Sequence, residues 1–254
     1  MSLSNISPLP STKTPPPSNP IPNDQILILP CTPADASMLV SLPSHHSHPP
    51  NTAQASCLYT SFPSTFWDLV EPPSQRPLPA IRLALMAKRL IPSLSDPAIQ
   101  WIKAVHAPTD ECMGMACWTL PGSAVHNPLR KSAIAFYAWD AKMRWTQHDV
   151  EEMFAHVCAE QWDVPIARND RLRAQFFQGQ AHWYLSPVCT WPKWQGMGVG
   201  RKLLAWALER ADRTGTPVYL RSAPEARGFY ERVGFEEVEE GVFVRRGKGG
   251  VGEV

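Results

Sequence analysis

The segment QGMGVG at residues 195–200, followed by Arg201 and Lys202, says most about the fold of this chain of 254 residues. Glycine at every second position lets the main chain approach a ligand closely and adopt conformations that a Cβ forbids. Apolar residues then recur at helical spacing over 203–211, so we expect a helix to begin at this loop. The first amides of a helix lack main-chain partners and lie at the positive end of its dipole, so the sequence predicts a pyrophosphate-binding loop here.

Two better-known phosphate-binding patterns fit this segment poorly. A phosphate loop of the GxxxxGK[ST] type needs a hydroxyl after its lysine, and here Leu203 follows Lys202. A dinucleotide fingerprint needs the spacing GxGxxG inside a βαβ unit, whereas these glycines are spaced by two. A glycine-rich turn that only joins a strand to a helix is the remaining alternative, and the flanking segments bear on it.

The flanking segments have the order strand, loop, helix, strand. Residues 181–190 (AHWYLSPVCT) are rich in aromatic and β-branched residues and stop at a Trp-Pro pair, which is typical of a strand that enters a turn. The helix is expected to end near Gly215, and residues 217–220 predict a short strand. Ser222 and Glu225 have the spacing of a capping box, which predicts a short helix after that strand. A final hairpin is predicted from strands at residues 235–238 and 242–245.

The pattern Q-x-x-G-x-G formed by Gln195, Gly198 and Gly200 resembles the acyl-CoA pyrophosphate loop of the GNAT superfamily of N-acetyltransferases. Residues 226–235 (ARGFYERVGF) resemble the second signature of that superfamily, in which a short helix carries a tyrosine four residues before a Gly-Phe pair. Both signatures occur in the family order, and together they cover residues 181–245. We therefore expect a GNAT-like protein, of a fungal-like branch that acts on small molecules or is uncharacterised.

The resemblance implies an α/β fold of the α+β kind, with a central, mostly antiparallel sheet flanked by helices. Upstream likeness is weaker: residues 25–29 and 32–42 resemble the opening strand and helix of the family, and residues 98–105 and 113–120 resemble its second and third strands.

Residues 122–180 stand where a minimal GNAT fold has a hairpin turn. Thr146 or Asp149 can cap a helix whose apolar residues share one stripe over 150–162, and Asn169 can start a second helix. The sequence therefore predicts a helical insertion between the third and fourth strands. It covers one face of the sheet or shapes the acceptor pocket, and the two roles are compatible.

The rest of the chain predicts one folded domain, residues 24–245, with tails. Residues 1–23 are rich in proline, serine and asparagine and cannot bury enough apolar surface to fold, so disorder is expected there. Residues 246–254 are glycine-rich and predict a flexible tail. Residues 43–80 contain many prolines and predict an irregular loop before a helix at 80–91.

Composition argues against several classes of partner. The net charge is +1 and no basic face carries interleaved aromatics, so we expect no binding to nucleic acid or to an anionic membrane. No apolar run approaches the ~20 residues of a membrane span, and no secretory signal is evident. Six cysteines without framework spacing indicate a reduced, cytoplasmic protein. Cys112, Cys117 and His126 are imaginable zinc ligands, but alternate strand positions face opposite ways, so core cysteines are favoured and no metal is predicted.

The resemblance implies that acetyl-CoA is the cosubstrate and lies along the strand at residues 181–190, so that its pantetheine pairs with main-chain groups like an added strand. A strand amide near Val188 would stabilise the oxyanion of the tetrahedral intermediate. The residues expected to bind the cosubstrate are Val188, Cys189, Thr190, Gln195, Gly196, Met197, Gly198, Val199, Gly200, Arg201, Lys202 and Ser222.

Direct attack by the amine needs its neutral form, and an alkylammonium of pKa ~10.4 loses its proton at a cost of roughly 4 kcal/mol near neutral pH. His182 is the candidate base, because it occupies about the place where some members of the superfamily carry a glutamate; a histidine that only hydrogen-bonds locally is the alternative. Tyr230 is the candidate acid that protonates the departing thiolate, with packing as its alternative role. Cys189 as an acyl-enzyme nucleophile is disfavoured, since no basic partner is placed near it.

The predicted function is transfer of an acetyl group from acetyl-CoA to a primary amine in a ternary complex. A small molecule, such as an amino-acid derivative, is the first candidate acceptor, and a protein lysine or N-terminal amine is the second. A catalytically silent acyl-CoA-binding module is the alternative from another class. Trp183, Trp191 and Trp194 flank the proposed cosubstrate strand and are candidates for an aromatic acceptor pocket, although burial alone would explain them.

Overall fold

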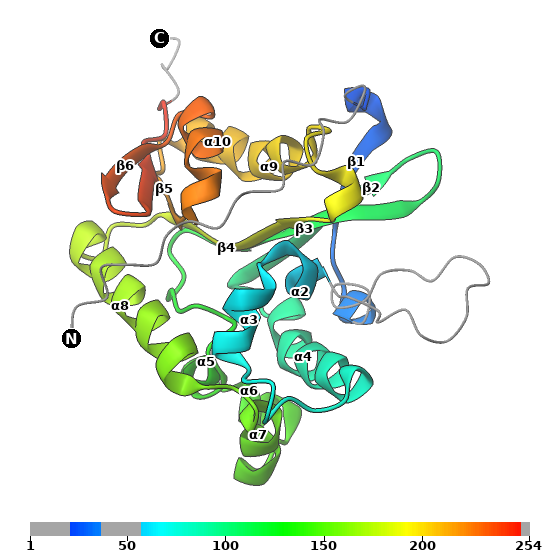
Figure 1. Cartoon of the computed structure of the whole chain (residues 1–254). Coiled ribbons are helices and arrows are strands. Elements are labelled where there is room, and N and C mark those ends of the chain that lie inside the picture. The colour runs from blue at the N-terminus through cyan, green and yellow to red at the C-terminus, as the bar shows by residue number, and fades with distance from the viewer. Residues whose placement is uncertain (1–20, 37–56, 250–254) are drawn as a thin grey trace, which may run out of the picture.

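The structure is a computed structural model that describes residues 21–36 and 57–249 (Figure 1). Most of the tail expected at residues 1–23 and most of the opening helix expected at 32–42 lie outside the described residues. The part of that helix within them is a short 3₁₀ turn, η2 (Pro33–Asp35).

Seven strands form one sheet in the order β1-β2-β3-β4-β5-β7-β6. Each neighbouring pair is antiparallel except β4 and β5, which are parallel. The predicted mixed, mostly antiparallel sheet is confirmed, and its strands lie close to the segments expected from the sequence. The strands are β1 (Ile26–Pro30), β2 (Ile99–His106), β3 (Glu111–Thr119), β4 (Trp183–Thr190), β5 (Val218–Arg221), β6 (Glu236–Glu239) and β7 (Val242–Arg245).

Helices α9 (Val199–Thr214) and α10 (Arg227–Arg232) cover one face of the sheet, as Figure 1 shows. The apolar stripe of α9 is fully buried and packs against β3 residues such as Ala116 and Trp118. Gly215 ends α9 in the left-handed conformation, with φ 66°, as its position after the last apolar residue predicts. The sequence of the helix thus determines both its buried face and its end.

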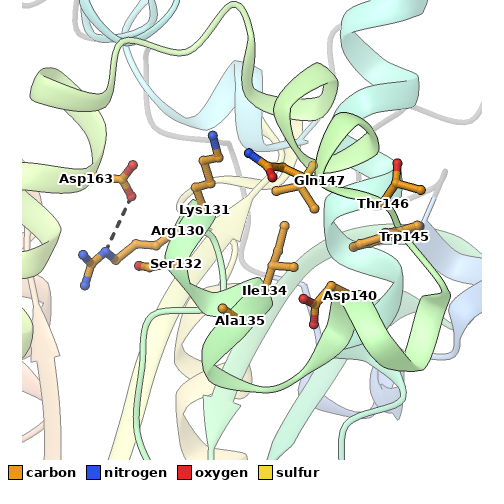
Figure 2. A pocket seen from close by; sticks show the side chains of 11 residues that line it. Arg130, Lys131, Ser132, Ile134, Ala135, Asp140, Trp145, Thr146, Gln147 and Asp163 are labelled. Carbon is orange, nitrogen blue, oxygen red and sulfur yellow. Dashed lines mark ion pairs between the residues drawn. The ribbon is translucent and has the colours of Figure 1, made fainter.

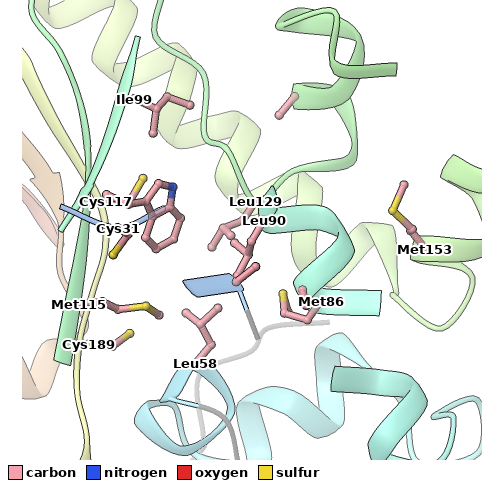
Figure 3. Packing of buried hydrophobic residues seen from close by; sticks show 14 of the residues in the cluster. Cys31, Leu58, Met86, Leu90, Ile99, Met115, Cys117, Leu129, Met153 and Cys189 are labelled. Atoms are coloured by element: carbon pink, nitrogen blue, oxygen red, sulfur yellow. The ribbon is translucent and has the colours of Figure 1, made fainter. Parts of the chain in front are cut away.

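The other face of the sheet carries the remaining helices, and Figure 3 shows part of the core between them. Met115, Cys117 and Cys189 project from the strands towards Leu58 and Leu90 of the helices. The helices on this face are α2 (Cys57–Ser61), α3 (Ser64–Val70), α4 (Pro79–Leu94), α5 (Lys131–Phe136), α6 (Trp139–Met143), α7 (Gln147–Phe154) and α8 (Ala159–Phe177).

Helices α5 to α8 lie between β3 and β4, which confirms the predicted helical insertion, but their bounds differ from the expectation. The stripe expected over residues 150–162 is broken, because α7 ends at Phe154 and α8 begins at Ala159. Asn169 does not start a helix: it lies inside α8, and its side chain accepts a hydrogen bond from Arg221 instead of capping a helix. Thr146 is the N-cap of α7, and its oxygen accepts from the amide of Asp149 over 3.2 Å.

The expectation of an irregular loop at residues 43–80 is wrong at residues 57–61 and 64–70, whereas residues 71–78 are irregular as expected. Residues 57–61 and 64–70 are helical, and prolines mark where helices begin rather than preventing them. Pro63 is the N-cap of α3 and Pro79 is the first residue of α4, a position where the missing N–H has no cost.

A buried charged cluster joins these helices. Glu71 is fully buried; it forms an ion pair with Arg82 and accepts a hydrogen bond from the Tyr59 hydroxyl over 3.1 Å. His156, between α7 and α8, lies 3.6 Å from the Glu71 carboxylate and 3.0 Å from the Arg89 guanidinium. Because Glu71 and Arg82 are paired away from water, the cluster fixes how the helical layer packs.

The end of the described chain packs on α9. Arg245 forms two hydrogen bonds with Asp212, over 2.7 and 2.8 Å, and the Lys248 amide donates to the same carboxylate over 3.2 Å. A Cβ at Gly247 would come within 2.6 Å of the Ala211 carbonyl oxygen. Residues 246–249 of the predicted flexible tail therefore contact the domain, and residues 250–254 lie outside the described residues.

Within residues 21–36 and 57–249, no helix is both long enough and apolar enough to cross a membrane.

Candidate active site

The sheet opens between β4 and β5. These strands pair only from Trp183↔Val218 to Leu185↔Leu220, whereas β4 continues along β3 as far as Thr190. The register between β3 and β4 shifts before Val188, and the Ser186–Pro187 peptide in this stretch is cis. From Val188 to Thr190, the edge of β4 that faces β5 therefore has no strand partner among the described residues. An unpaired edge of this kind can accept an extended ligand by main-chain pairing.

The glycine loop turns this edge into helix α9. Gly196 and Gly198 have positive φ angles of 77° and 90°, and Gly198 is the N-cap of α9. A Cβ placed on Gly198 would meet no atom within 4 Å, so open space lies in front of it. The Lys202 amide makes the first helical hydrogen bond, to the Gly198 carbonyl over 3.1 Å. The amides of Val199, Gly200 and Arg201 have no main-chain partner among the described residues, so they are free to donate to an anion. That they bind the pyrophosphate stays a prediction.

A cavity of about 530 Å³, here called the loop cavity, lies at this helix end. Its lining includes most of the residues expected to bind the cosubstrate: Val188, Thr190, Gln195, Gly196, Gly198, Val199, Gly200 and Arg201. Four expected residues, Cys189, Met197, Lys202 and Ser222, do not line it. The Cys189 side chain is buried in the core on the helical-insertion side of the sheet, so only its main chain can serve a ligand in this cavity.

Sequence reasoning missed Arg232, which also lines the loop cavity. This residue lies in the last turn of α10, so the cavity is lined by two cations, Arg232 and Arg201 at the start of α9. Arg232 lies outside the glycine motif. It is three residues from Phe229 in a helix, so both side chains share one helix face, and both line the cavity. This helical spacing is the sequence feature that could have indicated Arg232. Two guanidinium groups suit the charge of a pyrophosphate.

A second cavity of about 540 Å³, here called the splay cavity, occupies the opening between β4 and β5. It shares four lining residues with the loop cavity: Val188, Gln195, Ala226 and Tyr230. Its remaining walls come from β4 and the end of β5, which border the opening, and from the α2–α3 connection, α8 and the segment before α5. Ser222 lines this cavity and not the loop cavity. Its hydroxyl donates to the Ala223 carbonyl, and the N-cap of the following turn is Ala223, so the predicted capping box does not form.

Tyr230 lies where the two cavities meet. Its ring packs against Phe229, Phe235 and Phe243, with ring centroids 5.2 to 5.9 Å apart. Burial raises the pKa of its phenol, so the group stays protonated at neutral pH. Its hydroxyl has no hydrogen-bond partner in the part of the chain that the structure describes, and it is therefore available to donate to a group in the cavities.

His182 lies apart from both cavities. Its ring stacks on Phe177 with centroids 3.8 Å apart, its Nδ1 lies 2.8 Å from the Gln180 carbonyl, and its Nε2 lies 3.2 Å from the Arg173 guanidinium. Burial is the main cause that lowers the pKa of His182, followed by the charge of Arg173. The base role expected for His182 stays a prediction, and the occupation of both ring nitrogens weighs against it.

The tryptophans near β4 divide between core and cavity. Trp183 and Trp191 are buried, and only Trp194 lines the loop cavity. They therefore do not form an aromatic acceptor pocket together.

The cysteines considered as metal ligands are also core residues. Cys112 and Cys117 lie in the same core cluster, because a bulge between β2 and β3 changes which face of the sheet successive β3 side chains occupy. Burial raises the pKa of the Cys112 thiol to about 12. His126 is instead bonded to the Ser132 hydroxyl over 2.9 Å. The described residues contain no group of three metal-ligating side chains.

A further cavity of about 540 Å³ lies among the insertion helices and shares no lining residue with the other two (Figure 2). Ile134, Trp145 and Val150 form its apolar part, and the Arg130–Asp163 ion pair lies at its edge. Because neither the glycine loop nor the β4 edge reaches it, we place the candidate active site at the splay.

Comparisons with known proteins agree with this geometry. Residues 142–248, from the insertion to the last strand, match the acetyltransferase (GNAT) domain family. The chain carries a GNAT acetyltransferase domain. A solved structure from Corynebacterium glutamicum, described as histone acetyltransferase HPA2 and related acetyltransferase, has the same fold, with a TM-score of 0.52. The two chains are 19% identical, and the alignment covers 87% of this chain and 96% of that one.

Of two other similar proteins, one has a lower TM-score and the other matches over a shorter segment. An agmatine N-acetyltransferase mutant covers 88% of this chain and all of its own, with 11% identity and a TM-score of 0.49. The probable acyltransferase SID5 of Ajellomyces capsulatus is 35% identical over 48 residues, which are 19% of this chain. The match spans about a third (35%) of the length of that curated relative.

Proposed function

We propose that this GNAT domain transfers an acetyl group from acetyl-CoA to a primary amine of a small molecule, by direct attack within a ternary complex. One observation carries the proposal: a cavity at the N-terminus of α9 and a cavity in the sheet opening meet at Val188 and Tyr230. The first suits a diphosphate and its pantetheine arm, and the second is left for an acceptor. The thioester would then lie where the two substrates can meet.

The fit to acetyl-CoA rests on the glycine loop. The open space in front of Gly198 and the free amides of the first turn of α9 form a cradle for phosphate oxygens. Arg201 and Arg232 would balance the negative charge, and the free edge of β4 at Val188 and Thr190 would pair with the pantetheine amides. Acetyl-CoA supplies an activated acyl carbonyl. These residues hold it in place.

The chain's own groups account for most of the proton and charge movements. As the amine nitrogen bonds to the acyl carbon, the Val188 amide would stabilise the oxyanion. Tyr230 would give its phenolic proton to the sulfur as the carbon–sulfur bond breaks, and would regain a proton from the nitrogen or from water. The products are the amide and the free CoA thiol. The proton of the ammonium form leaves before attack, to water or to a base, for which His182 is the candidate from the sequence.

The walls of the splay cavity favour a small acceptor over a protein. The α2–α3 connection and α8 both line it, so the helical insertion takes part in shaping it as well as covering the sheet. A lysine presented by a protein surface needs an open groove, whereas a cavity of about 540 Å³ suits a metabolite-sized amine. The cytoplasmic location expected from the sequence stays a prediction.

A panel assay tests this function. The purified protein is incubated with acetyl-CoA and with each of a set of small amines, amino acids and lysine peptides, and released CoA thiol is measured. We expect release with at least one small amine and acetylated product of the matching mass. Release with peptides alone would move the acceptor to proteins. Binding of acetyl-CoA without release for any amine would show a silent acyl-CoA-binding module.

A further inference from the structure

Asn127 lies in the segment before α5 and reaches the floor of the splay cavity. It is buried, with 6% of its surface exposed. Its Oδ1 accepts from the Leu129 main-chain amide over 2.9 Å, and its Nδ2 donates to the hydroxyls of Tyr184 over 3.0 Å and Ser186 over 2.8 Å. Because a main-chain N–H can only donate, Leu129 fixes which end of the Asn127 amide faces the two hydroxyls.

This orientation determines the polarity of the cavity floor. Both hydroxyl oxygens accept from Asn127, which takes neither hydroxyl hydrogen. Burial raises the pKa of Tyr184, while hydrogen bonds from Ser186 and Asn127 partly offset this. The two hydroxyls can also bond to each other, but only one of them can donate in that bond. If Ser186 donates to Tyr184, the hydroxyl hydrogen of Tyr184 still has no acceptor. At least one hydroxyl hydrogen thus has no acceptor among the described residues and can serve a ligand in the cavity that both residues line.

Arg221 adds a cation to the same cavity. It stands at the end of β5, and its guanidinium donates to the side-chain oxygen of Asn169 on α8. An amide oxygen orients the guanidinium without neutralising it, and Arg221 forms no ion pair with a carboxylate among the described residues. The ring centroids of Tyr184 and Tyr219 lie 6.0 Å apart, and Tyr219 donates to the Asn169 main-chain carbonyl over 3.5 Å. Of these residues, Tyr184 and Arg221 line the cavity, both on the side formed with α8.

We propose that the acceptor is an amine that also carries a carboxylate, as amino acids do. The inference rests on the proposed acetyltransferase function. The carboxylate binds Arg221 and the hydroxyl hydrogens that Asn127 leaves free, on the side of the cavity formed with α8. The amine then extends to the opposite end, where Val188 and Tyr230 border the loop cavity. Asn127 is a positioning residue, and Arg221, Tyr184 and Ser186 determine specificity.

Matched pairs of amines test this inference. Each pair contains a carboxylate-bearing amine and its counterpart without the carboxylate: lysine with 1,5-diaminopentane, and 4-aminobutanoate with 1-aminopropane. We expect the wild-type kcat/KM to favour the carboxylate-bearing member by about tenfold to a hundredfold. Arg221→Gln should reduce that ratio. Arg168→Gln is the control, because Arg168 is an exposed cation on α8, next to Asn169, and does not line the cavity.

Asn127→Asp gives the sharper test because it reverses the polarity without changing the shape. An aspartate accepts from the Leu129 amide and from both hydroxyls, so their hydrogens turn away from the cavity and a negative charge is added. We expect the ratio within each pair to fall below that of the wild type or to invert. Equilibrium binding of each amine in the presence of CoA gives a second readout of the same preference, and a thermal melt confirms that the variant is folded.

The outcomes separate the inference from the function on which it rests. Acetylation that is equally fast or faster for the members without a carboxylate would overturn the inference and leave the acetyltransferase function standing. An unchanged ratio in both Arg221→Gln and Asn127→Asp would also overturn it. Absence of CoA release with every amine, together with equal binding of both members of each pair, would overturn both.

Discussion

Gly114 on β3 lies so close to Cys189 on β4 that a Cβ at position 114 would come within 2.5 Å of the Cys189 carbonyl oxygen and 3.1 Å of the Thr190 Cα. The approach occurs where β4 has left β5 and is held by β3 alone. The absence of a side chain at Gly114 therefore lets β3 hold the strand segment that we assign to the cosubstrate.

Gly114→Val should push β4 away from β3 at this point. We expect a loss of unfolding free energy of about 1–3 kcal/mol from overpacking, together with weaker acetyl-CoA binding, because the free edge of β4 would move. Urea unfolding and calorimetry measure the two effects. The control for the stability effect alone is Gly228→Ala in α10, where the nearest atom to the new Cβ is the flexible end of Arg232 at 3.3 Å and helix propensity favours alanine. Equal stability of the Gly114 variant and the wild type would contradict the close approach.

Tyr230→Phe removes the hydroxyl at the junction of the two cavities and keeps the ring that packs on Phe235 and Phe243. We expect kcat to fall by about tenfold to a hundredfold, because the thiolate would leave without a proton donor, while the dissociation constant of acetyl-CoA changes little. Steady-state kinetics and calorimetry measure the two quantities. A kcat equal to that of the wild type would remove Tyr230 from the mechanism.

Glu71→Gln should expose the role of the buried charged cluster. Burial by itself raises the pKa of Glu71, but the hydrogen bond with His156 and the charge of Arg82 outweigh it and hold the pKa below its ordinary value. The carboxylate therefore contributes stability above about pH 4.3, the ordinary pKa of a glutamate, and this contribution is lost as the pH falls through the lower folded-state pKa. We expect a loss of about 3–5 kcal/mol at pH 7, since Arg82 is left without its partner.

The pH dependence and a matched variant check this interpretation. Between about pH 5 and pH 3, the unfolding free energy of Glu71→Gln should decline less steeply than that of the wild type. Asp68→Asn makes the same chemical change on α3 in an exposed pair with Arg76, and it should cost less than about 1 kcal/mol. Similar effects for both variants would show that burial of Glu71 is not what makes its pair important.

His182→Gln separates the two roles considered for this histidine. With Nδ1 and Nε2 both bonded and the ring stacked on Phe177, we expect a loss of about 1–3 kcal/mol of stability and no shift in the acidic limb of the pH profile of kcat/KM. A catalytic base would instead produce a large fall in kcat/KM and a displaced acidic limb. The pH profile measured on both proteins decides between these results.

The sequence was most informative where local signals agree. In α9 the glycine N-cap, the apolar stripe and Gly215 all mark the same helix, and the strands on both sides carry aromatic and β-branched residues. The helix bounds in the insertion were harder to predict, because tertiary contacts there override the local sequence signals. Asn169 has the chemistry of an N-cap, yet its side chain is taken by Arg221 from β5, which is 52 residues away.

The site was predictable to the extent that it lies in one segment. The loop, the β4 edge and Tyr230 occur in family order within residues 181–245, so the sequence indicates the cosubstrate side. The acceptor side is assembled from the α2–α3 connection, from Asn127 and from α8, and no spacing in the sequence shows that these meet β4. Asn127 and Tyr184 are separated by 57 residues, and only the fold brings them within 3.0 Å.

Calorimetric titration of acetyl-CoA into Gly198→Val and the wild type shows whether the glycine loop binds the cosubstrate. Valine at this position would occupy the open space in front of the α9 amides and would also strain a φ of 90°. Gly179→Val is the matched control, since Gly179 has a φ of 89°, an equally open surrounding and no place in the loop cavity. We expect acetyl-CoA to bind the wild type and Gly179→Val alike and to bind Gly198→Val at least about tenfold more weakly. Equal affinity for all three proteins, or no binding to the wild type, would contradict the assignment of this loop to acetyl-CoA.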